Sequence, residues 1–139
     1  MLTSSPPARA DSGSPRLRVL VAEHDARVRR ALVALLSMEP RITVVASCSN
    51  AEAARALNQA LSPDVAVIGL LLPDANSGLA LVAEVSSCGV AVAAVGLRDG
   101  LLETALAAGA AAYLPKDGGP DLLLETLLGV TGRLVSPAE

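Results

Sequence analysis

The chain has 139 residues, of which 52% are hydrophobic and only 1% are aromatic, and its formal net charge is −3. This length allows one domain with a substantial aliphatic core and is too short for two ordinary domains. The acidic balance excludes a broad positive surface for phosphate-backbone binding, so any nucleic acid would be bound elsewhere.

Residues 1–15 are rich in Ser, Pro and charge and have no periodic apolar pattern, which predicts a disordered tail. They lack the apolar segment of a secretory signal, and later apolar runs are broken within about ten residues, short of the roughly 20 that cross a bilayer. We therefore expect one folded domain over residues 16–133, located in the cytoplasm and without a membrane span.

From residue 16 onward, short aliphatic runs alternate with helix-like apolar spacing. The runs typical of strands are 17–22, 41–47, 64–70, 89–96 and 111–114. Helical patterns follow at 25–38, 50–61, 77–87, 100–109 and 118–130. Asn50 is expected to cap the second helix and Gly109 to close the fourth. Five successive β-then-α units predict an α/β fold, a doubly wound five-stranded parallel sheet with helices on both faces.

Ligands of doubly wound sheets bind outside the carboxyl ends of the strands, near the point where the strand order reverses. The side chains to examine at these strand ends are those of Glu23, His24, Asp25, Gly69, Ala94 and Lys116. No GxGxxG or GxxxxGK[ST] pattern occurs, so the sequence indicates neither a dinucleotide site nor a P-loop.

These segments resemble a bacterial response-regulator receiver domain over about residues 16–133. RVLVAEHDARVRRAL is similar to the family's first strand, acidic turn and first helix, and SPDVAVIGLLLPDANSGLAL to its phosphoacceptor strand and loop. ALAAGAAAYLPKD is similar to its fourth helix and Lys-bearing fifth strand. The resemblance implies a flavodoxin-like receiver fold. In working members two acidic residues hold Mg²⁺, an Asp accepts the phosphoryl group, and a Thr or Ser and a Lys stabilise it.

Position by position, the resemblance indicates a degenerate phosphorylation pocket. The acidic pair corresponds to Glu23 and His24, the acceptor Asp to Gly69, and the hydroxyl residue to Ala94, while Lys116 is retained. Glycine has no atom that can attack phosphorus, and a neutral imidazole is a poor ligand for Mg²⁺. We therefore predict a pseudo-receiver without a cofactor, a metal or enzymatic activity.

Alternatives stay open for individual residues of this pocket. Lys116 is expected to pair with Glu23 or Asp25 because a buried ammonium needs a partner, although the two carboxylates could instead help to hold a cation. His24 is expected to fill the pocket and bond to one of them, or to act as a pH switch. Tyr113 corresponds to the family's switch aromatic, which swings between inward and outward poses. We expect its ring to be free of phosphorylation control, or simply half-buried with a wet hydroxyl.

The segment YLPKDGGPDLLLETL is similar to transcriptional regulators of the NarL/FixJ type, and VTGRLVSPAE resembles the approach to their linker. Residues 134–139 would then start a linker to a missing C-terminal helix-turn-helix domain. The resemblance implies a regulatory domain that dimerises through a helical face and contacts DNA only through the missing domain. A partner protein could also supply the input signal.

The alternative function is a small-molecule sensor. The missing side chains at Gly69 and Ala94 would leave apolar volume for a metabolite in the degenerate pocket. The resemblance extends to actinobacterial regulators with altered pockets, and the Ala-, Arg- and Leu-rich composition suits such a source.

Overall fold

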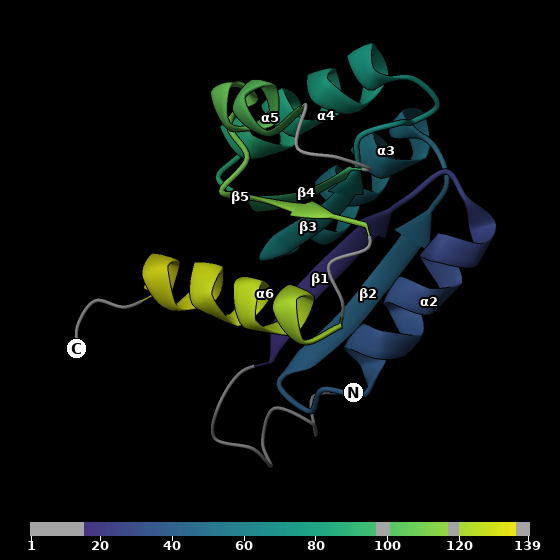
Figure 1. Ribbon diagram of the computed structural model, residues 1–139. Coiled ribbons are helices and arrows are strands. Elements are labelled where there is room, and N and C mark those ends of the chain that lie inside the picture. The colour runs from purple at the N-terminus through teal and green to yellow at the C-terminus, as the bar shows by residue number, and fades with distance from the viewer. Residues whose placement is uncertain (1–15, 97–100, 117–119, 136–139) are drawn as a thin grey trace.

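One parallel sheet of five strands forms the centre of the computed structural model, which describes residues 16–96, 101–116 and 120–135. The elements are labelled as in Figure 1. The strands are β1 (Leu17–Ala22), β2 (Ile42–Cys48), β3 (Val65–Gly69), β4 (Ala91–Gly96) and β5 (Ala112–Pro115). Their order across the sheet is β2-β1-β3-β4-β5, and every neighbouring pair is parallel.

Helices cover both faces of the sheet (Figure 1). The helices are α2 (Ala26–Ser37), α3 (Ala51–Leu61), α4 (Ala75–Ser87), α5 (Leu102–Ala108) and α6 (Pro120–Val135). Helices α3, α4 and α5 pack on one face, and α2 and α6 pack on the other. The strand order therefore reverses between β1 and β3, which is the flavodoxin-like arrangement that the sequence predicts.

The core consists of two aliphatic layers, one on each side of the sheet. Alternate residues of the buried strands point to opposite layers, as in Ala66 and Ile68 on one side and Val65 and Val67 on the other. All five residues of β3 are buried, because this strand lies in the middle of the sheet under helices on both faces. Ala, Val, Leu and Ile dominate both layers, as the near absence of aromatic residues requires.

The predicted elements all occur, with small differences at their ends. Asn50 caps α3 by accepting a hydrogen bond from the Ala53 amide, and α5 closes at Gly109, as predicted. α4 begins at Ala75, two residues before the predicted start, because Asp74 caps it through the Ser77 amide. α6 continues to Val135, past the predicted domain boundary at residue 133. The expected tail over residues 1–15 lies outside the described residues.

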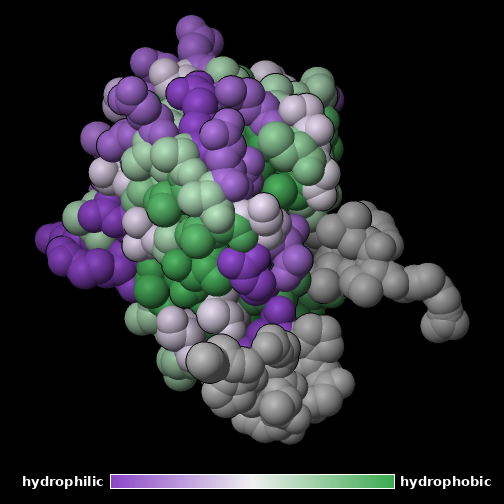
Figure 2. Space-filling view, turned by 180° about the vertical axis from the view of Figure 1, so that it is seen from behind, coloured by the Kyte–Doolittle hydropathy of each residue, from purple (hydrophilic) through white to green (hydrophobic). Residues whose placement is uncertain are grey.

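Hydrophobic and hydrophilic residues are not evenly distributed over the surface of the described residues. Figure 2 shows hydrophobic residues gathered in the middle of one face, with hydrophilic residues around them. The large hydrophobic side chains that are most exposed in the structure are Met38, Leu71, Leu102, Leu106 and Leu122. None of the helices in the described ranges is both long and apolar enough to cross a membrane.

Candidate functional site

The carboxyl ends of four neighbouring strands bring the predicted site residues to one edge of the sheet. β1 and β3 pair through Ala22 and Ile68, which places Glu23 and Gly69 side by side at the next position. Gly69 pairs in turn with Val95 of β4, and Gly96 pairs with Pro115 just before Lys116. Parallel register alone therefore assembles the site from residues that are far apart in the sequence.

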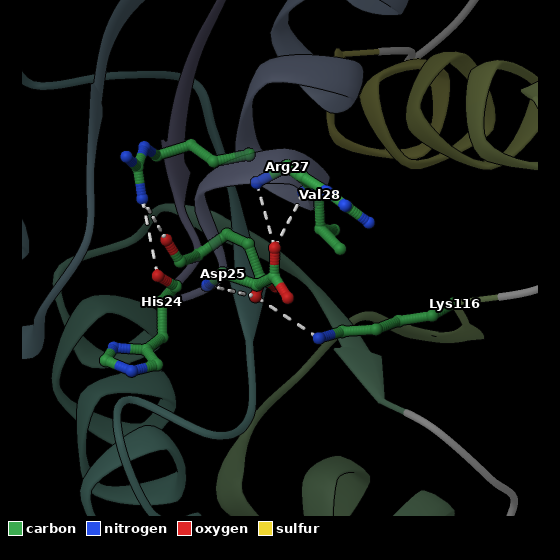
Figure 3. A network of polar contacts seen from close by, with 7 residues as sticks. His24, Asp25, Arg27, Val28 and Lys116 are labelled. Atoms are coloured by element: carbon green, nitrogen blue, oxygen red, sulfur yellow. Dashed lines mark hydrogen bonds and ion pairs between the residues drawn. The ribbon is translucent and has the colours of Figure 1, made fainter.

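Glu23 is the buried acid at the centre of the site, with only 1% of its surface exposed. Its Oε2 atom lies 3.2 Å from the Lys116 Nζ atom and accepts a hydrogen bond of 2.9 Å from the Asp25 amide. Figure 3 shows the Lys116 side chain reaching across to this carboxylate. The expected pairing of Lys116 with Glu23 or Asp25 is thus confirmed for Glu23, and the pair compensates for the burial of the carboxylate.

The second carboxylate oxygen of Glu23 lies against Gly69. A side chain at position 69 would place its Cβ atom 2.1 Å from Glu23 Oε1, far inside van der Waals contact. Oε1 is buried and has no hydrogen-bond partner among the described residues. The Glu23 carboxylate therefore occupies the space that any side chain at position 69 would need.

Asp25 is exposed and caps helix α2 with its carboxylate. Its Oδ1 atom accepts hydrogen bonds from the amides of Arg27 at 2.8 Å and Val28 at 3.2 Å. These bonds to the Val28 and Arg27 amides hold the pKa of the exposed Asp25 carboxyl below its usual value. The side chain thus has a structural role at the start of α2, where a carboxylate also suits the helix dipole.

His24 does not fill the pocket, so that expectation was wrong. The residue is exposed, and its imidazole points away from Lys116 in Figure 3. The reason is the tight turn after β1, in which Glu23 is buried and Asp25 caps α2, so that His24 between them projects into solvent. The His24 carbonyl oxygen lies 3.5 Å from the guanidinium of Arg29.

Arg29 is a site residue that the sequence reasoning missed. Its guanidinium donates a hydrogen bond of 2.9 Å to the carbonyl oxygen of Glu23 and so ties helix α2 to the turn that carries the buried acid. The spacing of the two residues could have predicted this contact. Arg29 lies one helical turn after the capping Asp25, and side chains of a helix point back toward its start.

The fourth strand contributes backbone and methyl groups to the site. Ala94 is fully buried and pairs with Ile68, whereas Val95 is the residue opposite Gly69. The half-buried Tyr113 lies on Gly96, where an added Cβ atom would come 2.2 Å from the tyrosine hydroxyl. The apolar volume expected near Gly69 and Ala94 is therefore filled, by Glu23 over the third strand end and by Tyr113 over the fourth.

The donor set at this edge does not fit a divalent cation. Glu23 faces an ammonium group at 3.2 Å, Asp25 is engaged in capping, and Gly69 offers no side-chain oxygen. Within residues 16–96, 101–116 and 120–135, no three His, Cys, Asp or Glu side chains gather into a metal-binding group. A hard cation such as Mg²⁺ needs several oxygen ligands, which these side chains do not supply together.

A cavity of about 390 Å³ lies on the other side of Lys116, between α2 and α6. Aliphatic side chains of both helices line it, and Val95 and Leu114 contribute from the sheet. No local pattern predicts this space, because it depends on the separation of two helices that are about 90 residues apart in the chain.

Comparison with known proteins finds similarity to one family and to several of its members. The sequence profile of the response regulator receiver domain matches residues 19–128. The nitrate/nitrite response regulator protein NarL of Escherichia coli K12 is 35% identical over 116 residues, which are 81% of this chain and 53% of that protein. A protein-glutamate methylesterase/protein-glutamine glutaminase of Cereibacter sphaeroides is 50% identical over 66 residues, 48% of this chain and 18% of that protein.

Solved structures agree with the sequence relatives. The signal receiver domain of the putative response regulator NarL from Mycobacterium tuberculosis matches with a TM-score of 0.78 and 28% identity, covering 86% of this chain and all of that one. The chain spans only about half the length of the regulators that it matches over most of its own length, 53% for NarL and 57% for the Bacillus subtilis regulatory protein YvfU. This chain belongs to the response regulator receiver domain family.

Proposed function

We propose that this chain is a pseudo-receiver, a receiver domain that regulates its partner domain without accepting a phosphoryl group. The observation that carries the proposal is the position of Glu23, whose carboxylate fills the space beside Gly69 and pairs with Lys116. In a working receiver that space holds the side chain of the acceptor, and the lysine contacts the phosphoryl oxygens. Here both places are already taken by one buried ion pair.

The neighbouring residues support the same proposal. Ala94 offers a methyl group where a hydroxyl would be needed, and neither Val95 nor Gly96 supplies one. With Glu23 and Lys116 neutralising each other, the site has no free nucleophile for group transfer, and we propose that the chain is not an enzyme. The ion pair would instead hold the strand ends in one fixed arrangement.

The relatives suggest which kind of protein contains this domain. NarL and YvfU are named as a response regulator and a transcriptional regulatory protein, and each matches over about four fifths of this chain. We propose that the chain is the regulatory half of a transcriptional regulator whose DNA contacts lie in another domain. The net charge of −3 agrees with a half that does not itself bind DNA.

The metabolite-sensor alternative loses its original site. Glu23 occupies the space at Gly69, and Tyr113, the partner of Ala94 in β5, lies on Gly96. A sensor function would have to use the cavity between α2 and α6 instead.

The proposal predicts that the protein does not form an acyl phosphate. The test is incubation with acetyl phosphate and Mg²⁺, followed by intact-protein mass spectrometry before and after hydroxylamine, which cleaves acyl phosphates. We expect no hydroxylamine-sensitive adduct, and we expect beryllofluoride with Mg²⁺ to leave the sedimentation coefficient unchanged. A receiver with Asp at the acceptor position, treated in parallel, is the positive control. A labile phosphoryl adduct on any carboxylate of this chain would refute the proposal.

A further inference from the structure

The cavity between α2 and α6 has the size and lining of a small-molecule site. Its volume of about 390 Å³ lies within the range of roughly 300–1,000 Å³ that is usual for ligand pockets. The space is open to solvent on one side, because Ala31 and Leu122, which line it, are both exposed. The space exists because α2 and α6 cover the same face of the sheet without closing over it.

Most of the side chains that line the cavity are aliphatic. Leu32 and Leu35 of α2 form one wall, and Leu122 and Leu123 of α6 form the other. The floor includes Leu114, which is 6% exposed. Leu122 is 41% exposed, so part of this wall is accessible to a ligand from solvent.

Lys116 is the single charged residue among those that line the cavity. Its side chain is 19% exposed, and its ammonium group carries three N–H donors. Among the described residues one of these donors is engaged, by Glu23 Oε2 at 3.2 Å. Lys116 therefore brings N–H donors to the lining of the cavity beyond the one that Glu23 engages.

These features define the ligand. A helix with its side chains is about 10 Å wide, so a volume of 390 Å³ would hold only about one turn of a partner helix. A single aliphatic chain fits this space better. Its head group must accept hydrogen bonds from an ammonium and carry no more than one negative charge, because the Glu23 carboxylate lies on the far side of the same ammonium.

We propose that the cavity between α2 and α6 binds an aliphatic monocarboxylate of medium chain length. The chain of the ligand lies between Leu32, Leu35, Leu122 and Leu123, and its carboxylate shares the Lys116 ammonium with Glu23. Binding would thereby connect this cavity directly to the ion pair at the strand ends. The inference stands on the cavity itself and does not depend on whether the chain accepts a phosphoryl group.

The test uses the complete 139-residue chain and decanoate as the probe, followed by calorimetry and by NMR of labelled Leu and Val methyl groups. We expect saturable binding with methyl shifts confined to the cavity. 1-Decanol should bind about tenfold more weakly because it lacks a charge-assisted hydrogen bond, and decylamine should bind more weakly still because its ammonium cannot accept a hydrogen bond from Lys116.

Two sets of variants distinguish this site from nonspecific adsorption. Ala31→Trp places a large ring in the cavity and should abolish decanoate binding. The matched control Ala34→Trp, on the same helix but outside the residues that line the cavity, should leave binding unchanged. The pair Glu23→Gln with Lys116→Met removes both charges and keeps the apolar stems. This double variant should bind decanoate and decanol equally.

Three outcomes would overturn the proposal. The first is an absence of saturable decanoate binding to a folded wild-type chain. The second is binding that survives Ala31→Trp, which would place the ligand elsewhere. The third is a change of oligomeric state on Ala31→Trp without any ligand effect, which would identify the cavity as an interface between copies of the chain.

Discussion

A side chain at position 69 and the carboxylate of Glu23 would need the same space, which cannot hold both. Gly69 has a backbone conformation open to any residue, since it is not among the glycines with positive φ. The space is what restricts the position, because a Cβ atom there would come 2.1 Å from Glu23 Oε1. Glu23 would have to leave both Lys116 and the Asp25 amide to make room.

Gly69→Ala is therefore expected to destabilise the protein by about 1–3 kcal/mol, the usual cost of overpacking a core. The free energy of unfolding, measured by urea denaturation, checks this. The same substitution in a Glu23→Ala background should be neutral or slightly stabilising, because the conflicting oxygen is gone and alanine reduces the entropy of the unfolded chain. The two substitutions should thus be strongly coupled.

Additive effects of Gly69→Ala and Glu23→Ala would contradict this account, since they would mean that the two positions do not compete for the same space. Gly89→Ala is unsuitable as a control because its φ of 87° strains any side chain. Gly129→Ala is a suitable control, because nothing lies within 4 Å of the Cβ position there.

The role of a residue was predictable from sequence where a charged side chain had to be buried and therefore needed an oppositely charged partner. The pairing of Lys116 followed from the cost of burying an ammonium alone, and the structure selects Glu23 as the partner. The direction of His24 was not predictable, because a turn of three polar residues gives no sign of which side chain enters the protein. The filling of the space at Gly69 was also missed, because it depends on the rotamer of Glu23 and not on the residue types alone.

Helix α2 is fixed to the site by its first turn. Asp25 accepts hydrogen bonds from the Val28 and Arg27 amides, which lower its pKa from an ordinary value of 3.8. A carboxyl whose pKa is lower in the folded state contributes stability above its unfolded pKa. That contribution is lost as the pH falls below 3.8 and through the folded pKa.

Asp25→Asn should therefore change how stability depends on pH. Asparagine is an equally good cap but does not titrate, so the variant should lose less stability than the wild type between neutral pH and about pH 3. Urea midpoints at both pH values give the comparison. Asp25→Ala, which removes the cap and the charge together, should be less stable than Asp25→Asn at neutral pH. Identical pH profiles for wild type and Asp25→Asn would exclude this role for the carboxylate.

Elements were predictable to within a few residues because each carries its own local signal. The aliphatic runs correspond to the strands, and Asn50 and Gly109 mark helix ends in the predicted places. The start of α4 was placed too late because its cap, Asp74, follows a proline and lies before the apolar helical pattern. The cavity between α2 and α6 has no local signal at all, since its walls come from opposite ends of the chain.

At the scale of the whole molecule, one helix has an exposed apolar face through which the dimer expected from the resemblance could form. Leu102 and Leu106 lie four residues apart, on one face of α5, and are 38% and 45% exposed. Neighbouring large apolar side chains on a surface helix are typical of a protein interface. We propose that two copies of the chain pack through this face, independently of any phosphoryl group.

Leu102→Glu together with Leu106→Glu should convert the dimer into a monomer, because four carboxylates would then face one another across the interface and lose their hydration. Sedimentation velocity measures the change, and circular dichroism confirms that the variant is folded. Met38→Glu is the matched control: Met38 is 78% exposed at the end of α2, on another part of the surface, so its substitution should leave the dimer intact. A wild-type chain that sediments as a monomer at high micromolar concentration would rule out the dimer itself. A dimer unaffected by the α5 substitutions would instead place the interface on another face.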